Sequence, residues 1–176
     1  MNKIIVSVFA LAILITACNN EKKTGNTDKK DNAMMMDNSK PERNKKVVMS
    51  SMEAIQKGDI DGMVKDAAPG FVDYTDGSIP PVTNLDSLKG FIKMFTTAIE
   101  GYKPSNLMLV AEGDYVFAYA TWSGTFKSDV MGIKATGKMV SFPDVDIFKF
   151  NEDGKITEHR SVQNTGAALM TFSMMK

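Results

Sequence analysis

The hydrophobic pattern divides the chain into an early part with helical periodicity and a later part that alternates. Apolar residues in the early part recur at the spacing of amphipathic helices. Helices are predicted over residues 43–57, 60–67 and 85–99. Gly58 follows the first helix and Gly101 the third, and both are expected to end them.

Aromatic and β-branched residues dominate the second half of the chain, which is typical of strands. Strands are predicted over residues 71–74, 106–111, 115–126, 138–150 and 155–163. An Asp153–Gly154 turn should join the last two as an antiparallel hairpin, and the apolar residues 167–175 are expected to be helical. A run of helices followed by a run of strands predicts an α+β fold, with the helices packed on one face of a curved, mainly antiparallel sheet.

The first residues have the pattern of an export signal. A short charged start precedes an apolar run over residues 4–15, and small residues lead to Cys18. The run has about a dozen residues, fewer than the roughly 20 that a membrane-spanning helix needs. Residues 14–18 resemble the lipobox of bacterial lipoproteins, which implies cleavage before Cys18 and acyl chains on it. The alternative is an ordinary cleaved signal peptide that leaves a free thiol.

These patterns predict three segments. Residues 1–17 form a signal peptide, residues 18–42 a lipidated cysteine with a flexible polar linker, and residues 43–176 one folded domain. The protein is then expected in the bacterial cell envelope, held at a membrane by its acyl chains. Asn19 is not the aspartate that favours inner-membrane retention in enteric bacteria, which points to the outer membrane.

Composition excludes several kinds of function. Lys plus Arg and Asp plus Glu are equal at 21 each, so no net charge attracts nucleic acid. With Cys18 acylated, no thiol is left for a disulfide or a thiolate metal site, and the single His159 has no HExxH spacing. No metal or cofactor is expected. The methionines at 34–36 are a possible soft site for Cu(I), but consecutive residues in a linker favour a plain tether.

Residues 145–159 read Val-Asp-Ile-Phe-Lys-Phe-Asn-Glu-Asp-Gly-Lys-Ile-Thr-Glu-His. They resemble the last hairpin of the SnoaL-like branch of the NTF2-like superfamily, where an Asp-Ile-Phe-Arg strand, a Gly-Lys-Ile turn and a Glu-His-Trp-Asp-Val strand follow one another. The resemblance implies a cone-shaped α+β barrel in which a strongly bent sheet and the helices enclose one pocket. Its members include polyketide cyclases, isomerases, dehydratases and noncatalytic binding modules.

The same resemblance implies that Asp146 and His159 line the pocket and transfer protons. From the residues alone, the hairpin brings Asp146 opposite His159, Arg160 or Ser161, depending on the register of the two strands. The alternative is that Asp146, His159 or both point to solvent. Two positions depart from the family, because Arg160 replaces its Trp and Ser161 its following Asp. A hydroxyl has no useful pKa near neutrality, which weighs against cyclase activity.

Five further residues are predicted to contact a ligand. Asp144 shares a face with Asp146, and the strand before it is rich in aromatic residues suited to a flat or greasy molecule, although core packing alone explains most of them. The predicted contacts are Tyr74, Trp122, Phe142, Asp144 and Arg160. We therefore expect an anchored domain that binds a small apolar or amphipathic ligand without turnover. The alternatives are an enzyme that transfers protons on a carbonyl compound, and a partner-binding or homodimerising module.

Overall fold

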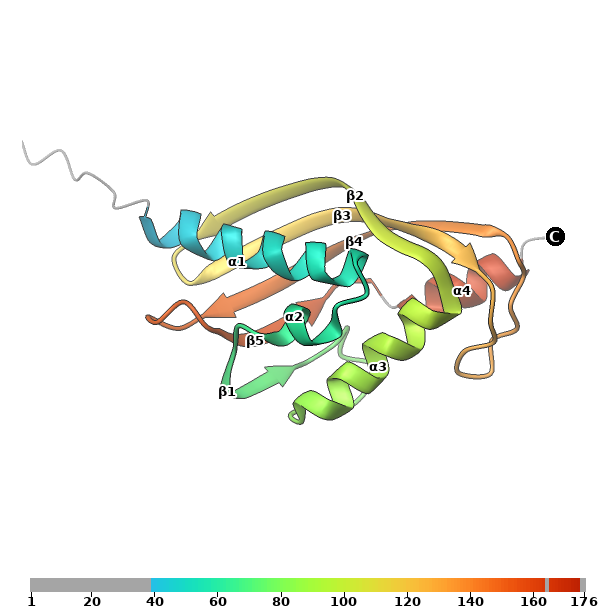
Figure 1. Ribbon diagram of the computed structural model, residues 1–176, viewed down its shortest axis with the longest axis horizontal. Helices are drawn as coiled ribbons and strands as arrows, with labels where there is room; N and C mark the ends of the chain where they lie inside the picture. The colour runs from blue at the N-terminus through green and yellow to red at the C-terminus, as the bar shows by residue number, and fades with distance from the viewer. Residues whose placement is uncertain (1–38, 164, 175–176) are drawn as a thin grey trace, which may run out of the picture. The chain divides into compact units, whose positions relative to one another are not determined.

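The computed structural model describes residues 39–163 and 165–174 (Figure 1). The predicted signal peptide, Cys18 and the methionines at 34–36 lie outside these residues. Within the described part, no helix is both long enough and apolar enough to cross a membrane.

A five-stranded, mostly antiparallel sheet forms the framework of the described residues (Figure 1). Its order is β1-β5-β4-β3-β2, and only the pairing of β1 with β5 is parallel. The sheet is curled and open, with β1 and β2 at its edges. The strands are β1 (Ala67–Asp73), β2 (Ile99–Glu112), β3 (Tyr115–Phe126), β4 (Met139–Phe150) and β5 (Ile156–Ser161). The α+β class and the antiparallel order of the last four strands are confirmed.

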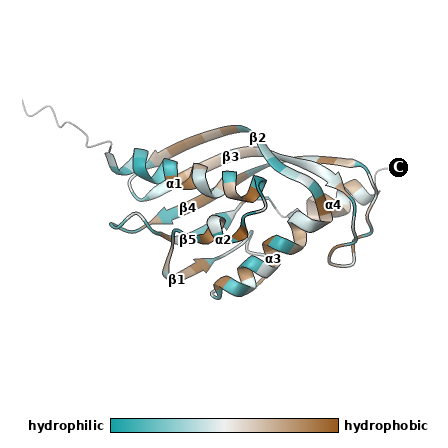
Figure 2. Ribbon diagram, viewed as in Figure 1, coloured by the Kyte–Doolittle hydropathy of each residue, from teal (hydrophilic) through white to brown (hydrophobic). Residues whose placement is uncertain are grey.

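The described residues also form four helices, whose apolar residues pack with those of one face of the sheet (Figure 1). They are α1 (Ser39–Gln56), α2 (Ile60–Val64), α3 (Leu85–Ala98) and α4 (Thr165–Met174). The side chain of Asn84 accepts a hydrogen bond from the Ser87 backbone and caps α3. Hydrophilic and hydrophobic residues alternate along α3, whose apolar side faces the core (Figure 2). The helices α1, α2 and α3 therefore enclose a space against the sheet.

Strand alternation buries every second residue along most of β3 and throughout β4, on the face that the helices cover. On β4 the buried positions include Asp144 and Asp146, between apolar neighbours of the same face. Directly opposite them on β3 are Ala120 and Ala118, whose small side chains leave room beside the carboxylates. The sheet thus combines an apolar inner face with two aspartates at its centre.

Several boundaries differ from the prediction, and α1 begins at Ser39, within the residues predicted as a linker. Strand β2 begins at Ile99, directly after α3, and Gly101 lies inside the strand rather than after a helix. The pairing of β2 with β3 shifts register between Glu100 and Lys103, so Gly101 belongs to a bulge and adopts a φ of 69°. Helix α2 ends at Val64, before the predicted end at residue 67. Strand β1 begins at Ala67, earlier than the strand predicted at 71–74, because Pro69 and Gly70 lie within an irregular edge strand and do not end the helix.

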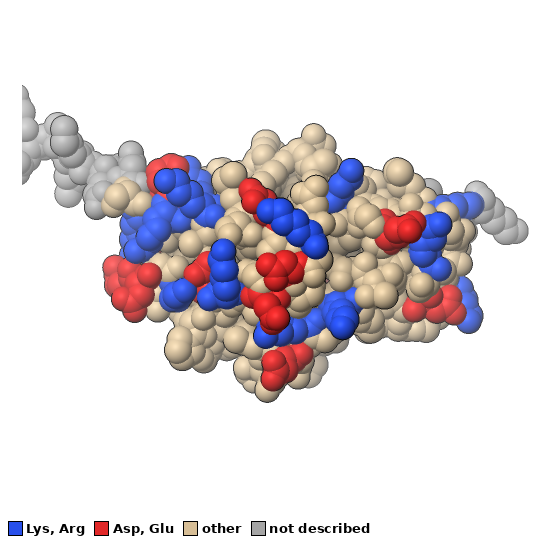
Figure 3. All heavy atoms as spheres, in the orientation of Figure 1, with Lys and Arg blue, Asp and Glu red and all other residues tan. Residues whose placement is uncertain are grey.

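Charges of both signs are intermixed on the face that Figure 3 shows. Many are paired: the Lys40 ammonium lies 2.6 Å from an Asp114 oxygen, and the Lys89 ammonium lies 2.7 Å from an Asp61 oxygen. Exposed pairs of this kind contribute little to stability. The polar groups that matter for chemistry lie inside.

Candidate functional site

A cavity of about 240 Å³ lies between the helices and the inner face of the sheet. Its walls are mainly apolar: Met52, Leu88 and Phe91 come from the helices, and Trp122 and Phe148 come from the sheet. Its polar groups are concentrated on one wall, where β1, β4 and β5 lie side by side. An apolar cavity with a few convergent polar groups is the usual form of a small-molecule site.

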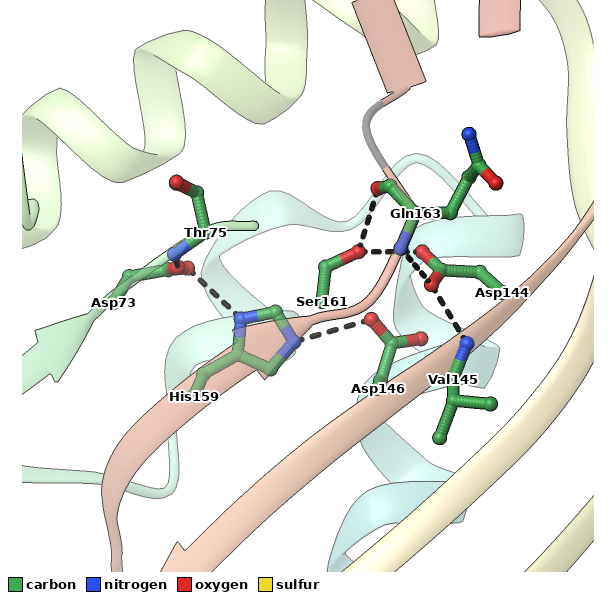
Figure 4. Close-up of polar contacts among 8 residues, drawn as sticks. All are labelled: Asp73, Thr75, Asp144, Val145, Asp146, His159, Ser161 and Gln163. Carbon is green, nitrogen blue, oxygen red and sulfur yellow. Dashed lines mark hydrogen bonds and ion pairs between the residues drawn. The ribbon is translucent and has the colours of Figure 1, made fainter. Parts of the chain in front are cut away.

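His159 lies between two carboxylates at this wall (Figure 4). Its Nδ1 atom is 3.0 Å from Asp73 Oδ2, and its Nε2 atom is 3.1 Å from Asp146 Oδ1. Burial disfavours the charged imidazole, but the hydrogen bonds to Asp146 and Asp73 outweigh it and raise the pKa of His159 to about 10. At neutral pH the ring is therefore an imidazolium that donates to both aspartates.

Three strands bring these groups together. His159 is the register partner of Asp73 across the parallel β1–β5 pair, and Asp146 is the partner of Ser161 across β4–β5. His159 faces the cavity from β5, and its ring centroid lies 4.9 Å from that of Phe148. The imidazole orientation is fixed by strand pairing and packing together.

Asp146 is the least satisfied of the buried aspartates. Burial raises the pKa of its carboxyl group, and the bond from His159 offsets part of that rise. Its Oδ1 atom accepts from His159, whereas no donor to its Oδ2 atom is found within the described residues. A carboxylate with one free oxygen in an apolar cavity can accept a proton or a hydrogen bond from a ligand.

Asp144 has a different environment two residues away. Its Oδ1 atom accepts from the backbone N–H groups of Val145 at 2.6 Å and Gln163 at 2.8 Å. The Ser161 hydroxyl donates to its Oδ2 atom at 2.6 Å (Figure 4). Both carboxylate oxygens are thus engaged, so Asp144 ties the end of β5 to β4.

Tyr102 and Trp122 form an aromatic part of the cavity wall. Their rings stack with centroids 4.8 Å apart and an interplanar angle of 13°. Burial raises the pKa of the Tyr102 phenol, and the negative charges of Asp146 and Asp144 raise it further. The phenol therefore stays protonated and able to donate a hydrogen bond.

The structure brings together some of the predicted residues and separates others. Asp146 and His159 are in contact, and Asp144 and Trp122 line the cavity with them. Phe142 packs in the core and is not part of the cavity lining.

Tyr74 and Arg160 also lie outside the cavity lining, so the predicted ligand contacts of Phe142, Tyr74 and Arg160 have no counterpart in this geometry. The Arg160 guanidinium lies over the Tyr74 ring, 3.9 Å from its centroid. Arg160 follows His159 on β5 and therefore points to the opposite face.

Asp73 and Tyr102 are polar residues of the site that are not among the predicted site residues. Asp73 reaches the site through parallel pairing with a strand far away in sequence, and its only local signal is a carboxylate that ends an apolar strand. The sequence does not predict Tyr102 in the site, because Gly101 before it indicates the end of a helix. A glycine before an aromatic residue is also a signal for a bulge.

Among the described residues, no group of three His, Cys, Asp or Glu side chains is arranged to hold a metal ion. The aspartates instead surround the imidazole, which is itself a cation.

Comparison with known proteins gives the family of this fold. Residues 46–171, which make up most of the chain, match the family model of the SnoaL-like polyketide cyclases. The chain belongs to the SnoaL-like polyketide cyclase family. The hairpin resemblance at residues 145–159 is therefore confirmed at the level of family. No curated protein matches the chain.

Solved structures share the SnoaL-like fold. AclR from Streptomyces galilaeus, a candidate hydroxylase, has a TM-score of 0.66 at 24% identity, covering 77% of this chain and 99% of AclR. A candidate SnoaL-like polyketide cyclase from Jannaschia sp. CCS1 has a TM-score of 0.68 at 21% identity, covering 77% and 95%. IdmH from Streptomyces antibioticus, a candidate polyketide cyclase, has a TM-score of 0.60 at 19% identity, covering 73% and 96%. At these identities the likeness shows the fold.

Proposed function

We propose that this SnoaL-like domain binds a small, mainly apolar carbonyl compound in its cavity and moves a proton at the carbon next to the carbonyl. Asp146 is the proposed acid/base. The observation that carries the proposal is the buried contact of Asp146 Oδ1 with His159 Nε2 at 3.1 Å, which leaves Oδ2 without a donor among the described residues. Family neighbours that are candidate cyclases support the same class of chemistry.

The environment of Asp146 suits a base. Burial raises the pKa of its carboxyl group, so the carboxylate is a stronger base than a solvated one. His159 holds the carboxylate through Oδ1 and leaves Oδ2 for the ligand. Asp73 in turn holds the other side of the imidazole at 3.0 Å. A preorganised, poorly hydrated carboxylate of this kind is what proton abstraction from carbon needs.

Capture of a ligand without turnover is the second candidate. Its support is Ser161, which stands where the resembling family pattern has an aspartate and whose hydroxyl is bonded to Asp144 at 2.6 Å. Ser161 has no useful pKa near neutrality and cannot act as an acid or base there. Under this candidate the cavity would hold a carbonyl compound and release it unchanged.

One experiment separates the two candidates, with the neutral bicyclic ketone 2-tetralone as probe. Binding is followed through Trp122, which is the chain's single tryptophan and lines the cavity. Turnover is followed in D₂O as loss of the ¹H NMR signals beside the carbonyl. The parent is compared with Asp146→Asn and with Asp129→Asn, an exposed aspartate paired with Lys134.

The proton-transfer proposal expects exchange by the parent and by Asp129→Asn, and loss of exchange with retained binding in Asp146→Asn. Binding by the parent with no exchange beyond that of buffer would contradict proton transfer and support capture. No change in Trp122 fluorescence at saturating ketone would contradict both candidates.

The location of the domain is a separate part of the proposal. The apolar run at 4–15 and the lipobox-like residues 14–18 support attachment to the cell envelope through acyl chains on Cys18. The test is the mass of the full chain expressed in a bacterial host and extracted from membranes. A product beginning at Cys18 with added acyl mass supports anchoring, and it should be lost in Cys18→Ser. An unmodified thiol in the soluble fraction would contradict it.

We also propose that the domain forms a homodimer through the outer face of its sheet. Met108, Val110 and Phe117 are 60%, 65% and 41% exposed on the neighbouring strands β2 and β3, and Val110 is the register partner of Phe117, so they form one exposed apolar group. Mass measurement of the domain at micromolar concentrations tests this proposal. A dimer that Phe117→Lys dissociates would support it, and a monomer throughout would contradict it.

A further inference from the structure

Tyr102 occupies an irregular position in β2 that turns it into the cavity. The register of β2 with β3 shifts between Glu100 and Lys103, and Gly101 takes a φ of 69°. A bulge of this kind leaves residues unpaired and re-aims a side chain. Around it β2 is largely exposed, but Tyr102 is partly buried and lines the cavity.

The partner strand is shaped to accept this bulge. A Cβ atom at Gly124 would lie 2.5 Å from Ile99 Cγ2, 2.9 Å from the Glu100 carbonyl oxygen and 3.2 Å from Tyr102 Cα. Only the absence of a side chain at Gly124 lets the backbone around Tyr102 approach so closely. The ring is then fixed by its stacking on Trp122 at 4.8 Å.

The hydroxyl group of Tyr102 is available to a ligand. No hydrogen bond from it is found within the part of the chain that the structure describes, and Tyr102 lines the same cavity as Asp144 and Asp146. Burial and the charges of Asp146 and Asp144 raise the pKa of the phenol, so it remains a donor. Tyr102 and Asp146 thus present a donor and an acceptor to the same space.

The charge of the lining restricts the ligand. Three buried aspartates line the cavity, Asp73, Asp144 and Asp146, whereas within the described residues no lysine or arginine does. His159 supplies one positive charge, which is shared between two of these carboxylates. A ligand carboxylate or phosphate would meet uncompensated negative charge in a poorly hydrated space. The cavity therefore suits an uncharged molecule.

We propose that Tyr102 is a further catalytic residue of this site, donating a hydrogen bond to the carbonyl oxygen of a neutral, enolisable ketone or aldehyde. The inference rests on the proposed function of Asp146. The carboxylate of Asp146 takes a proton from the carbon beside the carbonyl, and the C–H electron pair becomes the C=C bond of an enolate. The carbonyl π pair moves to oxygen, where the Tyr102 O–H stabilises the charge. The carboxyl proton of Asp146 then exchanges with D₂O, the deuteron is delivered to the enolate carbon, and the C=O bond re-forms, which completes the exchange.

Tyr102→Phe tests this role because it removes the hydroxyl and keeps the ring that stacks on Trp122. The matched control is Tyr119→Phe, on the opposite face of β3, outside the cavity lining. Exchange of 2-tetralone in D₂O should fall by about 100-fold in Tyr102→Phe, as when one oxyanion donor is lost, and stay unchanged in Tyr119→Phe. Trp122 fluorescence shows whether ketone binding is retained.

Binding of planar probes provides a readout that does not depend on turnover. The probes are 2-naphthol, which resembles an enol, 2-naphthoate, which adds a negative charge, and naphthalene, which has no polar group. The parent should bind 2-naphthol more tightly than naphthalene and should not bind 2-naphthoate. Tyr102→Phe should weaken 2-naphthol by about threefold to tenfold, the usual net value of one hydrogen bond, and leave naphthalene unchanged.

The outcomes separate this inference from the proposed function. Exchange that is lost in Asp146→Asn but unchanged in Tyr102→Phe would overturn the role of Tyr102 and leave Asp146 as the acid/base. A parent that binds 2-naphthol through Tyr102 but exchanges no ketone would overturn the proposed reaction and leave Tyr102 as a binding group. Equal binding of 2-naphthoate and 2-naphthol would overturn the neutral substrate class.

Discussion

Asp73 and His159 meet across the parallel pairing of β1 with β5, with Asp73 Oδ2 and His159 Nδ1 3.0 Å apart. The Asp73 backbone N–H and carbonyl both bond to Val82, and Asp73 Oδ1 accepts from the Thr75 N–H at 2.6 Å. The aspartate is therefore held firmly on both sides. It can orient the imidazole while the other ring nitrogen bonds to Asp146.

The first prediction concerns the protonation of His159. Its pKa of about 10, against the ordinary 6.5, places its titration far above neutral pH. It is the chain's single histidine, so its ring ¹H and ¹³C NMR signals are unambiguous. They should stay constant between pH 5 and 8, and in Asp146→Asn the midpoint should move down because one bonding carboxylate is lost. A midpoint near 6.5 in the parent would show that the two carboxylates do not hold the ring as an imidazolium.

The same shift predicts how stability depends on pH. The folded-state pKa of His159 lies above its unfolded value, so its contribution is fully present below about pH 6.5 and is lost as the pH rises through 10. Urea denaturation should show the free energy of unfolding falling over this window. In His159→Gln the fall should be smaller, since Gln does not titrate. Parallel curves for the two proteins would contradict the prediction.

Gly124 should tolerate no side chain. Gly124→Ala places Cβ 2.5 Å from Ile99 Cγ2 and against the bulge backbone, so we expect a loss of about 1–3 kcal/mol. The control is Gly90→Ala in α3, where no atom lies within 4 Å of the new Cβ and a gain of up to about 1 kcal/mol is expected. Denaturation in urea measures both, and Trp122 fluorescence reports whether the stacking on Tyr102 is disturbed. Equal stability of the two variants would contradict the close approach at Gly124.

Ser161→Asp introduces the aspartate that the SnoaL-like hairpin pattern has at this position, but we expect it to destabilise this protein. The Ser161 hydroxyl donates to Asp144 at 2.6 Å, and a carboxylate there would repel Asp144 instead. At neutral pH the free energy of unfolding of Ser161→Asp should be about 1–3 kcal/mol lower than that of the matched Ser161→Asn, whose amide can still donate a hydrogen bond to Asp144. The gap should narrow as the pH falls and one carboxyl is protonated. An Asp variant as stable as the Asn variant at pH 7 would show that Asp144 does not depend on this donor.

The closing hairpin could be predicted well from the sequence. An Asp-Gly turn and the period-two alternation restrict its register to within a residue or two, which is enough to place Asp146 near His159. The structure adds that Asp146 pairs with Ser161 and contacts His159 diagonally.

Asp73 and Tyr102 depend on information that a local pattern lacks. The pairing of Asp73 with His159 is long-range and parallel, and nothing near Asp73 specifies it. The inward turn of Tyr102 depends on the bulge at Gly101 and on space at Gly124, a residue of the partner strand. Contacts between strands that are distant in sequence therefore determine the positions of both side chains.

The central claim is that Asp146 acts as an acid/base toward a neutral carbonyl compound. The most direct measurement is the rate of deuterium incorporation into 2-tetralone by the parent and by Asp146→Asn at equal ketone occupancy, judged from Trp122 fluorescence. The account predicts that the parent exceeds buffer and that Asp146→Asn loses at least about 100-fold of that rate, the usual contribution of a positioned acid or base. Equal rates in parent and variant would contradict it.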